Sequence, residues 1–157
     1  MRSRNAWLAF ACSIYAVLGS SNASADTAEE VRVWYESQYA PHFVTLQNIN
    51  ANRIVDFYTS AFQNHPLSAS PITIINSVES WNGWKQSLAS AGWTGGTVRS
   101  VDVETLNERT AVIVAHWDNR YQSESPSRTV LQSCNWYLAT KDADRWRITS
   151  HVELPCN

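Results

Sequence analysis

The sequence predicts an α+β domain in which a curved antiparallel sheet wraps around helices. Two patterns support the class. Apolar residues in the first half of the chain recur mostly at helical spacing, whereas from Thr97 onward they alternate with a period of two. Helices followed by an antiparallel meander are typical of an α+β fold with the helices against one face of the sheet.

The helical half is expected to hold three helices and one short strand. A capping box at residues 27–30 begins the first helix, and Pro41 interrupts it. A second short helix carries Ile54 to Phe62 and ends before Pro66, and residues 68–71 form a loop. The β-branched segment 72–75 is a strand. The third helix is capped by Asn76 or Ser77, carries Trp81, Trp84 and Leu88, and stops at Gly92.

Residues 1–25 are predicted to be a cleaved secretory signal peptide. Arg2 and Arg4 precede an apolar run over residues 6–19, and Ala23-Ser24-Ala25 has the pattern of a cleavage site. The run is short for a membrane span. We therefore expect an exported protein, periplasmic or secreted, with no membrane attachment after cleavage. A membrane anchor or a buried N-terminal helix is the alternative.

The remaining residues, 26–157, are expected to form one domain. The chain has 12 basic and 14 acidic residues, for a net charge of −2, and removal of Arg2 and Arg4 changes this to −4. That balance lacks the positive charge of a nucleic-acid-binding domain. Apolar residues at 44% exclude a disordered chain. Eight tryptophans require a core or a cavity for their rings.

The last part of the chain predicts four strands, and their turns predict how they pair. The strands cover residues 97–105, 110–121, 129–140 and 146–154, with a longer loop over 122–128. If Thr105 faces Thr110, Val101 pairs with Val114, and if Thr140 faces Trp146, the second hairpin follows. The more apolar face of each hairpin is expected to point inward.

This register predicts a cavity with an apolar base and a polar mouth. The base would contain Val101, Val103, Val112, Trp136, Leu138 and Ile148, and the mouth would contain Arg99, His116, Asp118 and Gln132. The outer face would then carry Ile113, Ala115, Trp117, Leu131 and Tyr137. Such an apolar patch usually has a partner, so a homodimer is expected there unless a helix or the C-terminal tail covers it.

Several of these segments together resemble the NTF2-like superfamily. They are the aromatic first helix, the stretch Asn52-Arg53-Ile54-Val55-Asp56-Phe57-Tyr58, and the final strand Arg145-Trp146-Arg147-Ile148 after an acidic turn. The SnoaL-like and ketosteroid-isomerase-like branches are the nearer comparison. The resemblance implies a cone that binds a small, mostly apolar molecule and dimers formed through the sheet. Members include isomerases, dehydratases, epoxide hydrolases and polyketide cyclases, so the fold alone sets no function.

The candidate catalytic residues are His116, Asp118 and Tyr35. His116 and Asp118 are two apart on one strand, and a histidine oriented by a carboxylate is a common general base. The alternative is an Arg99–Asp118 salt bridge beside a hydrogen-bonded histidine. Asn50 and Asn52 occupy a segment where many catalytic relatives place an acid, which argues against a direct isomerase assignment.

The candidate ligand-binding residues are Arg99, Gln132, Trp136, Tyr39 and Tyr58. No cofactor is expected, because the sequence has neither a phosphate loop nor a dinucleotide fingerprint. No metal is expected either, because the four histidines lack ligand spacing with each other or with the cysteines.

Cys134 and Cys156 are the two cysteines of the predicted mature chain. The expected register puts Cys134 opposite Val152, which leaves Cys156 about 13 Å further along and out of disulfide reach. A turn at Pro155 would close part of this gap. An intramolecular bridge and a free Cys134 with an intersubunit Cys156 therefore both remain open.

Three functions follow from these observations. The first is an exported domain that binds a small hydrophobic molecule. The second is a cofactor-independent lyase, isomerase or hydrolase that uses His116 and Asp118 with Tyr35 or Tyr39. The third is an interaction module of an exported complex that uses the face carrying Trp117 and Tyr137.

Overall fold

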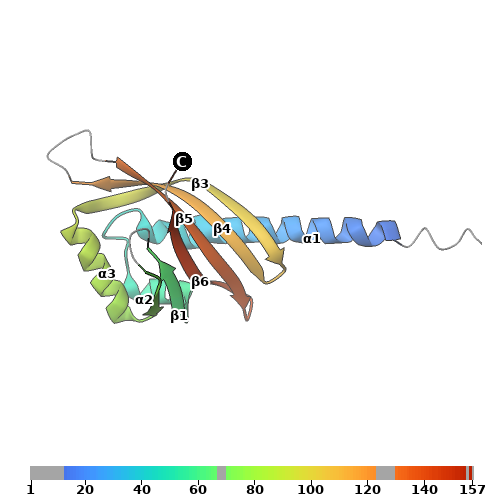
Figure 1. The fold of residues 1–157 in the computed structure, drawn as a ribbon, viewed down its shortest axis with the longest axis horizontal. Helices are drawn as coiled ribbons and strands as arrows, with labels where there is room; N and C mark the ends of the chain where they lie inside the picture. Colours follow the sequence, from blue (N-terminus) through green and yellow to red (C-terminus); the bar gives the residue numbers. More distant parts are fainter. Residues whose placement is uncertain (1–12, 67–69, 123–129, 155, 157) are drawn as a thin grey trace, which may run out of the picture.

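A computed structural model describes residues 13–66, 70–122, 130–154 and 156. Its centre is a six-stranded sheet in the order β2-β1-β6-β5-β4-β3. The sheet is curved and unclosed, and helices lie against its inner side (Figure 1). Neighbouring strands are antiparallel except β1 and β6, which are parallel. The expected α+β class and the curved sheet around helices are confirmed.

The four expected strands of the second half are present; β4 has the predicted bounds, and the other three are longer than predicted. The strands in chain order are β1 (Tyr58–His65), β2 (Ile72–Ile75), β3 (Trp93–Asn107), β4 (Thr110–Tyr121), β5 (Val130–Asp142) and β6 (Arg145–Leu154). The β5–β6 turn has Ala143 and Asp144 at φ 44° and 62°. Two successive left-handed residues match the twist of a tight hairpin, which is why this turn joins two long strands.

The helices also follow the sequence in part. They are α1 (Ser13–Trp34), a π-helical turn η1 (Tyr35–Tyr39), a 3-10 turn η2 (Ala40–Phe43), α2 (Ala51–Ile54), a 3-10 turn η3 (Val55–Phe57) and α3 (Val78–Ser90). The regular helix α1 ends at Trp34, and Pro41 lies at the start of η2, where the π-helical turn gives way to a 3-10 turn. Ser77 caps α3 by accepting from the Ser80 amide, and Gly92 follows α3 at φ +76°.

The prediction that the second helix continues to Phe62 is wrong. Helical structure stops at Phe57, and residues 58–65 form β1, between β2 and β6. Tyr58 and Phe62 are both buried and four residues apart, a spacing that places two side chains on one face of a helix or of a strand. Here they lie on a strand, whose pairing with β6 is irregular between Tyr58 and Gln63. Pairing on both sides overrides the local pattern.

The first helix begins earlier than the capping box predicts. Helix α1 already runs from Ser13, and its first half projects beyond the strands (Figure 1). Glu30 closes no capping box; its carboxylate instead accepts from Lys141 Nζ at 2.7 Å and from Trp146 Nε1 at 3.1 Å. These bonds join the helix to the β5–β6 hairpin and lower the pKa of Glu30.

The predicted cleavage point, between Ala25 and Asp26, lies inside α1. Cleavage and export stay predictions. The residues 1–12, with Arg2 and Arg4, and most of the expected loops at 68–71 and 122–128 lie outside the described residues. Within the described residues, no helix is both long and apolar enough to cross a membrane.

The predicted inward face of β4 and β5 is wrong. Thr105 pairs with Ala111 rather than Thr110, and the ladder is irregular between Thr105 and Asn107. Val101 therefore pairs with Ala115 instead of Val114. Because side chains alternate along a strand, one extra residue at the turn exchanges the two faces of β4.

The exchange carries over to β5, because residues paired across β4 and β5 lie on the same face. His116 pairs with Cys134 and Asp118 with Gln132. The inner face carries Ala111, Ile113, Ala115, Trp117, Tyr137 and Ala139, all buried. The outer face carries Val112, Val114, His116, Asp118, Trp136 and Leu138, with Trp136 45% exposed.

The exchange of faces also corrects the prediction of which residues form a dimer or partner surface. Ile113, Trp117 and Tyr137 are buried under the helices of the same chain and offer no surface to another protein, whereas Leu131 is exposed. The helices thus cover this apolar face, which was one of the two explanations open for it. A homodimer stays a prediction, without these three residues as its interface.

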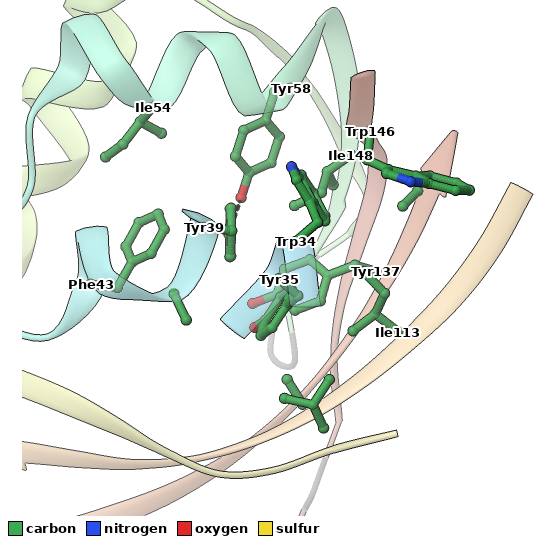
Figure 2. Packing of buried hydrophobic residues seen from close by; sticks show 14 of the residues in the cluster. Trp34, Tyr35, Tyr39, Phe43, Ile54, Tyr58, Ile113, Tyr137, Trp146 and Ile148 are labelled. Carbon is green, nitrogen blue, oxygen red and sulfur yellow. Dashed lines mark hydrogen bonds between the residues drawn. The ribbon is translucent and has the colours of Figure 1, made fainter. Parts of the chain in front are cut away.

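Aromatic side chains from η1, η2, β1 and β5 meet at the centre of the core. Figure 2 shows Tyr35, Tyr39, Tyr58 and Tyr137 gathered there, with the Tyr58 hydroxyl directed toward Tyr39. The Tyr39 and Tyr58 oxygens are 2.5 Å apart, and the Trp117 Nε1 donates to the Tyr35 oxygen at 3.1 Å. Each buried hydroxyl in these pairs has a partner, as burial requires.

Cys134 and Cys156 form a disulfide, with their Cα atoms 5.3 Å apart. Thr140 pairs with Arg147 rather than Trp146, which shifts the β5–β6 register by one residue, and an irregularity between Leu138 and Ala139 adds a second. Cys134 therefore lies opposite Leu154 rather than Val152. This two-residue shift brings Cys156 within reach of Cys134. The bridge ties the end of β6 to the outer face of β5.

Candidate functional site: an aromatic cavity beneath helix α3

A cavity of about 440 Å³ lies between α3 and the inner face of the sheet. One wall comes from α3, η1 and η2, and the other from β1, β3, β4, β5 and β6. Its described lining comprises Tyr39, Phe43, Tyr58, Phe62, Asn64, Ile74, Ser80, Trp81, Trp84, Leu88, Trp93, Trp117, Asn119, Tyr121, Leu131, Gln132, Ser133, Asn135, Tyr137, His151, Glu153, Leu154 and Cys156.

Aromatic rings form the helix side of the cavity. Trp81 stacks on Phe62 with ring centroids 5.9 Å apart and planes 7° apart, and Trp84 meets Trp81 edge to face at 5.6 Å. Trp81 is held by a hydrogen bond from its Nε1 to Asn76 Oδ1 at 2.8 Å. Helical spacing places Trp81, Trp84 and Leu88 on one stripe of α3, and that stripe faces the sheet.

Polar side chains form a chain of hydrogen bonds across the sheet side. Trp93 Nε1 donates to Asn119 Oδ1 at 3.0 Å, and Asn119 Nδ2 donates to Ser133 Oγ at 2.8 Å. Asn135 Nδ2 also donates to Ser133 Oγ, at 3.1 Å. The Asn135 oxygen in turn accepts from His151 Nε2 at 3.0 Å. We call Asn119, Ser133, Asn135 and His151 the polar row.

His151 is an uncharged member of the polar row. Its ring stacks on Tyr137 with centroids 4.8 Å apart and planes 9° apart. Burial, with the nearby charge of His65 as a smaller cause, lowers the pKa of His151 to about 4. Because Nε2 carries the proton given to Asn135, the neutral ring leaves Nδ1 as its acceptor nitrogen.

The buried tyrosines are neutral phenols, which can donate or accept hydrogen bonds. Burial raises the pKa of Tyr35, Tyr39 and Tyr58 well above the ordinary value for a phenol. Burial also raises the pKa of Tyr137 to about 12. These four side chains therefore carry no charge into the core at neutral pH.

The structure brings three of the sequence-predicted residues to the cavity wall. Tyr39, Tyr58 and Gln132 line the cavity, and their part in binding stays a prediction. Tyr35 is fully buried behind the wall and is absent from the described lining.

The other predicted residues lie on the outside of the sheet. Trp136 is half-exposed there, and Arg99 lies 3.9 Å from Asp118 on the surface. His116 Nδ1 is 3.2 Å from the Cys134 sulfur. A general base must reach the proton it removes, and His116 and Asp118 are on the face away from the cavity. The Arg99–Asp118 ion pair, the alternative considered for this cluster, is present.

The polar row was missed because it depends on the inverted face. Asn119 is two residues from Trp117, and Ser133, Asn135 and Tyr137 alternate along β5. The sequence therefore contained the signal, one polar residue on β4 and two on β5 in phase with large aromatic residues. Assigning those aromatic residues to the outer face concealed it.

Among the described residues, one group of side chains has potential metal-ligand atoms close together. Atoms of His116, Cys134 and Cys156 lie within 4.8 Å of one another. Both sulfurs belong to the disulfide, and metal binding by cysteine requires a thiolate. In the bridged form this cluster thus offers a metal only the imidazole.

Comparisons with known proteins agree with the fold. The model of a family described as NTF2-like protein (DUF6841) matches residues 28–156. No curated protein matches the chain.

Solved structures of the same fold are distant in sequence. LinA is 5% identical at a TM-score of 0.64, over 85% of this chain and 91% of its own. An NTF2-like protein with a cystatin-like fold from Novosphingobium aromaticivorans is 13% identical, at 0.60 and 90% of both chains. A candidate ketosteroid isomerase from Shewanella frigidimarina is 16% identical, at 0.53, over 87% and 98%. At these identities, the likeness concerns the fold alone.

Proposed function

Because the chain belongs to an NTF2-like family, we propose that it binds a small, largely apolar molecule in the cavity beneath α3. The observation that carries this proposal is the composition of the wall. Aromatic rings from α3 and β1 face a short row of hydrogen-bonding groups on β4, β5 and β6. An apolar pocket with a few convergent polar groups is the usual form of a small-molecule site.

The size of the cavity fits this role. A volume of about 440 Å³ is within the range of pockets that enclose drug-sized molecules. Trp84 is 38% exposed, so part of its ring stays at the surface beside the opening. A flat molecule that enters there would stack against rings that are already in place, which limits the ordering that binding requires.

The uncharged fluorescent probe N-phenyl-1-naphthylamine tests the proposal. Its emission should rise on binding to the wild-type protein and saturate at one probe per chain. Trp84→Ala should weaken binding at least about fivefold, since a buried aromatic contact contributes about 1 kcal/mol or more. Trp136→Ala is the matched control, because Trp136 is a partly exposed tryptophan on the opposite face of the sheet.

The two variants also define the contrary result. Absence of saturable probe binding to the folded wild-type protein, or equal loss in Trp84→Ala and Trp136→Ala, would show that the cavity is not the binding site. Native mass spectrometry of protein from its own host would then identify any molecule that it carries.

A further inference from the structure

The hydrogen bonds of the polar row converge on one atom. Ser133 Oγ accepts from Asn119 Nδ2 and from Asn135 Nδ2, which occupy both of its lone pairs. The orientation of each amide is fixed from the other end, by Trp93 Nε1 on Asn119 and by His151 Nε2 on Asn135. The Ser133 hydroxyl is therefore left as a donor, and no described residue is shown to accept its proton.

The charge of the wall is the second observation. Among the described lining residues none is a lysine or an arginine, and Glu153 is the only carboxylate. His151 is neutral, as its environment requires. The faces of the aromatic rings carry partial negative charge. An anionic ligand would lose its hydration here without gaining a cationic partner.

Resting on the proposed binding function, we propose that the cavity selects an uncharged aromatic ligand with one hydrogen-bond acceptor, such as a ketone oxygen, bound by the Ser133 hydroxyl. The rings of Trp81, Trp84 and Phe62 hold the flat part of the ligand. The acceptor oxygen meets the Ser133 hydroxyl, whose proton the hydrogen bonds from the two amides leave available. The two amides hold the serine oxygen in place, so the hydroxyl has little orientation to lose on binding.

Three compounds with one skeleton test this selection by calorimetry. They are 2-acetylnaphthalene, with a neutral acceptor, 2-ethylnaphthalene, with none, and 2-naphthoate, an anion. The wild-type protein should bind the ketone about five- to tenfold more tightly than the ethyl compound, the value of one hydrogen bond. The carboxylate should bind most weakly of the three.

Two variants assign the selection to Ser133. Ser133→Ala should remove the advantage of the ketone over the ethyl compound and leave the affinity for the ethyl compound unchanged. Ser133→Thr keeps the hydroxyl and should keep the advantage. Thermal unfolding of both variants checks that the row still folds, and the wild-type ranking tests the selection independently of them.

The outcomes separate this inference from the proposed function. If neither N-phenyl-1-naphthylamine nor any of the three compounds binds, the proposed function fails and the inference fails with it. If the probe binds but the carboxylate binds as tightly as the ketone, only the inference is overturned. A ketone preference that survives in folded Ser133→Ala also overturns it.

Discussion

His151 donates from its Nε2 to the side-chain oxygen of Asn135 at 3.0 Å beside the cavity, and burial keeps its imidazole neutral by lowering its pKa. The ring stacks on Tyr137 and is buried, and both features separate it from water. The nearby charge of His65 opposes the addition of a proton to this ring. Protonation of His151, which pairs with Asn135, therefore links the stability of the fold to the solution pH.

We expect the free energy of unfolding to fall as the pH is lowered from about 6.5 to about 4. The unfolded chain binds a proton at His151 near its ordinary pKa of 6.5, whereas the folded chain binds it only near 4. The unfolded state holds more protons in this window, so acid favours it, by up to about 3 kcal/mol. Urea unfolding at pH 7, 6 and 5 measures the loss.

Two histidine variants separate this effect from general acid sensitivity. His151→Gln should flatten the pH dependence between 6.5 and 4.5. His116→Gln, a substitution of a histidine on the outer face, is measured beside it as the control. Glu30 does not confuse the result, because its lowered pKa makes its own contribution disappear only below its ordinary value of 4.5. An undiminished slope in His151→Gln would contradict the assignment.

The disulfide should contribute about 3 kcal/mol to stability. It joins residues 22 apart, and closing a loop of this length restricts the unfolded chain by about that amount. Cys134→Ser combined with Cys156→Ser should show this loss in urea unfolding, and a reductant should lower the wild type to the same value. A reductant that destabilises the double variant as well, or leaves the wild type unchanged, would contradict this.

The local signals of the sequence were sufficient for most elements. Pro41, Ser77 and Gly92 act through their own backbone and their nearest neighbours, and each marks a boundary that the structure contains. The class of fold follows from the change of hydrophobic period, which is likewise a property of neighbouring residues.

The candidate site required information that is not local. A pairing shift of one residue near Asn107 and Thr110 decides which side chains of β4 face the helices. Both faces of this strand are apolar in sequence, with valines on one and isoleucine, alanine and tryptophan on the other, so choosing the more apolar face gave the wrong one. In the structure Trp117 packs against Phe43 and beside Gly96, contacts between residues that are distant in the sequence.

The exchanged faces predict opposite behaviour for two tryptophans of the sheet. Trp117 is 5% exposed and Trp136 is 45% exposed. Trp117→Ala should cost about 3–5 kcal/mol of stability, the usual loss for a buried large ring. Trp136→Ala should cost less than about 1 kcal/mol. Urea unfolding measures both, and equal costs, or a larger cost at Trp136, would restore the face assignment that the sequence suggested.

The last prediction compares two glycines, one at which an added Cβ would meet nearby atoms and one at which it would have open space. A Cβ on Gly95 would collide with the Val44 carbonyl oxygen, which accepts the Gly96 amide at 3.1 Å. Gly95→Ala must therefore push the segment after η2 away from β3, at a cost of about 1–3 kcal/mol. Because Phe43 precedes this segment and lines the cavity, binding of the naphthylamine probe should weaken too.

Gly83 lies in α3 with open space around it, so Gly83→Ala should instead stabilise the protein by about 0.5–1 kcal/mol. Thermal unfolding of both variants measures the two changes in stability. A Gly95→Ala variant as stable as the wild type would show that η2 does not depend on this close approach.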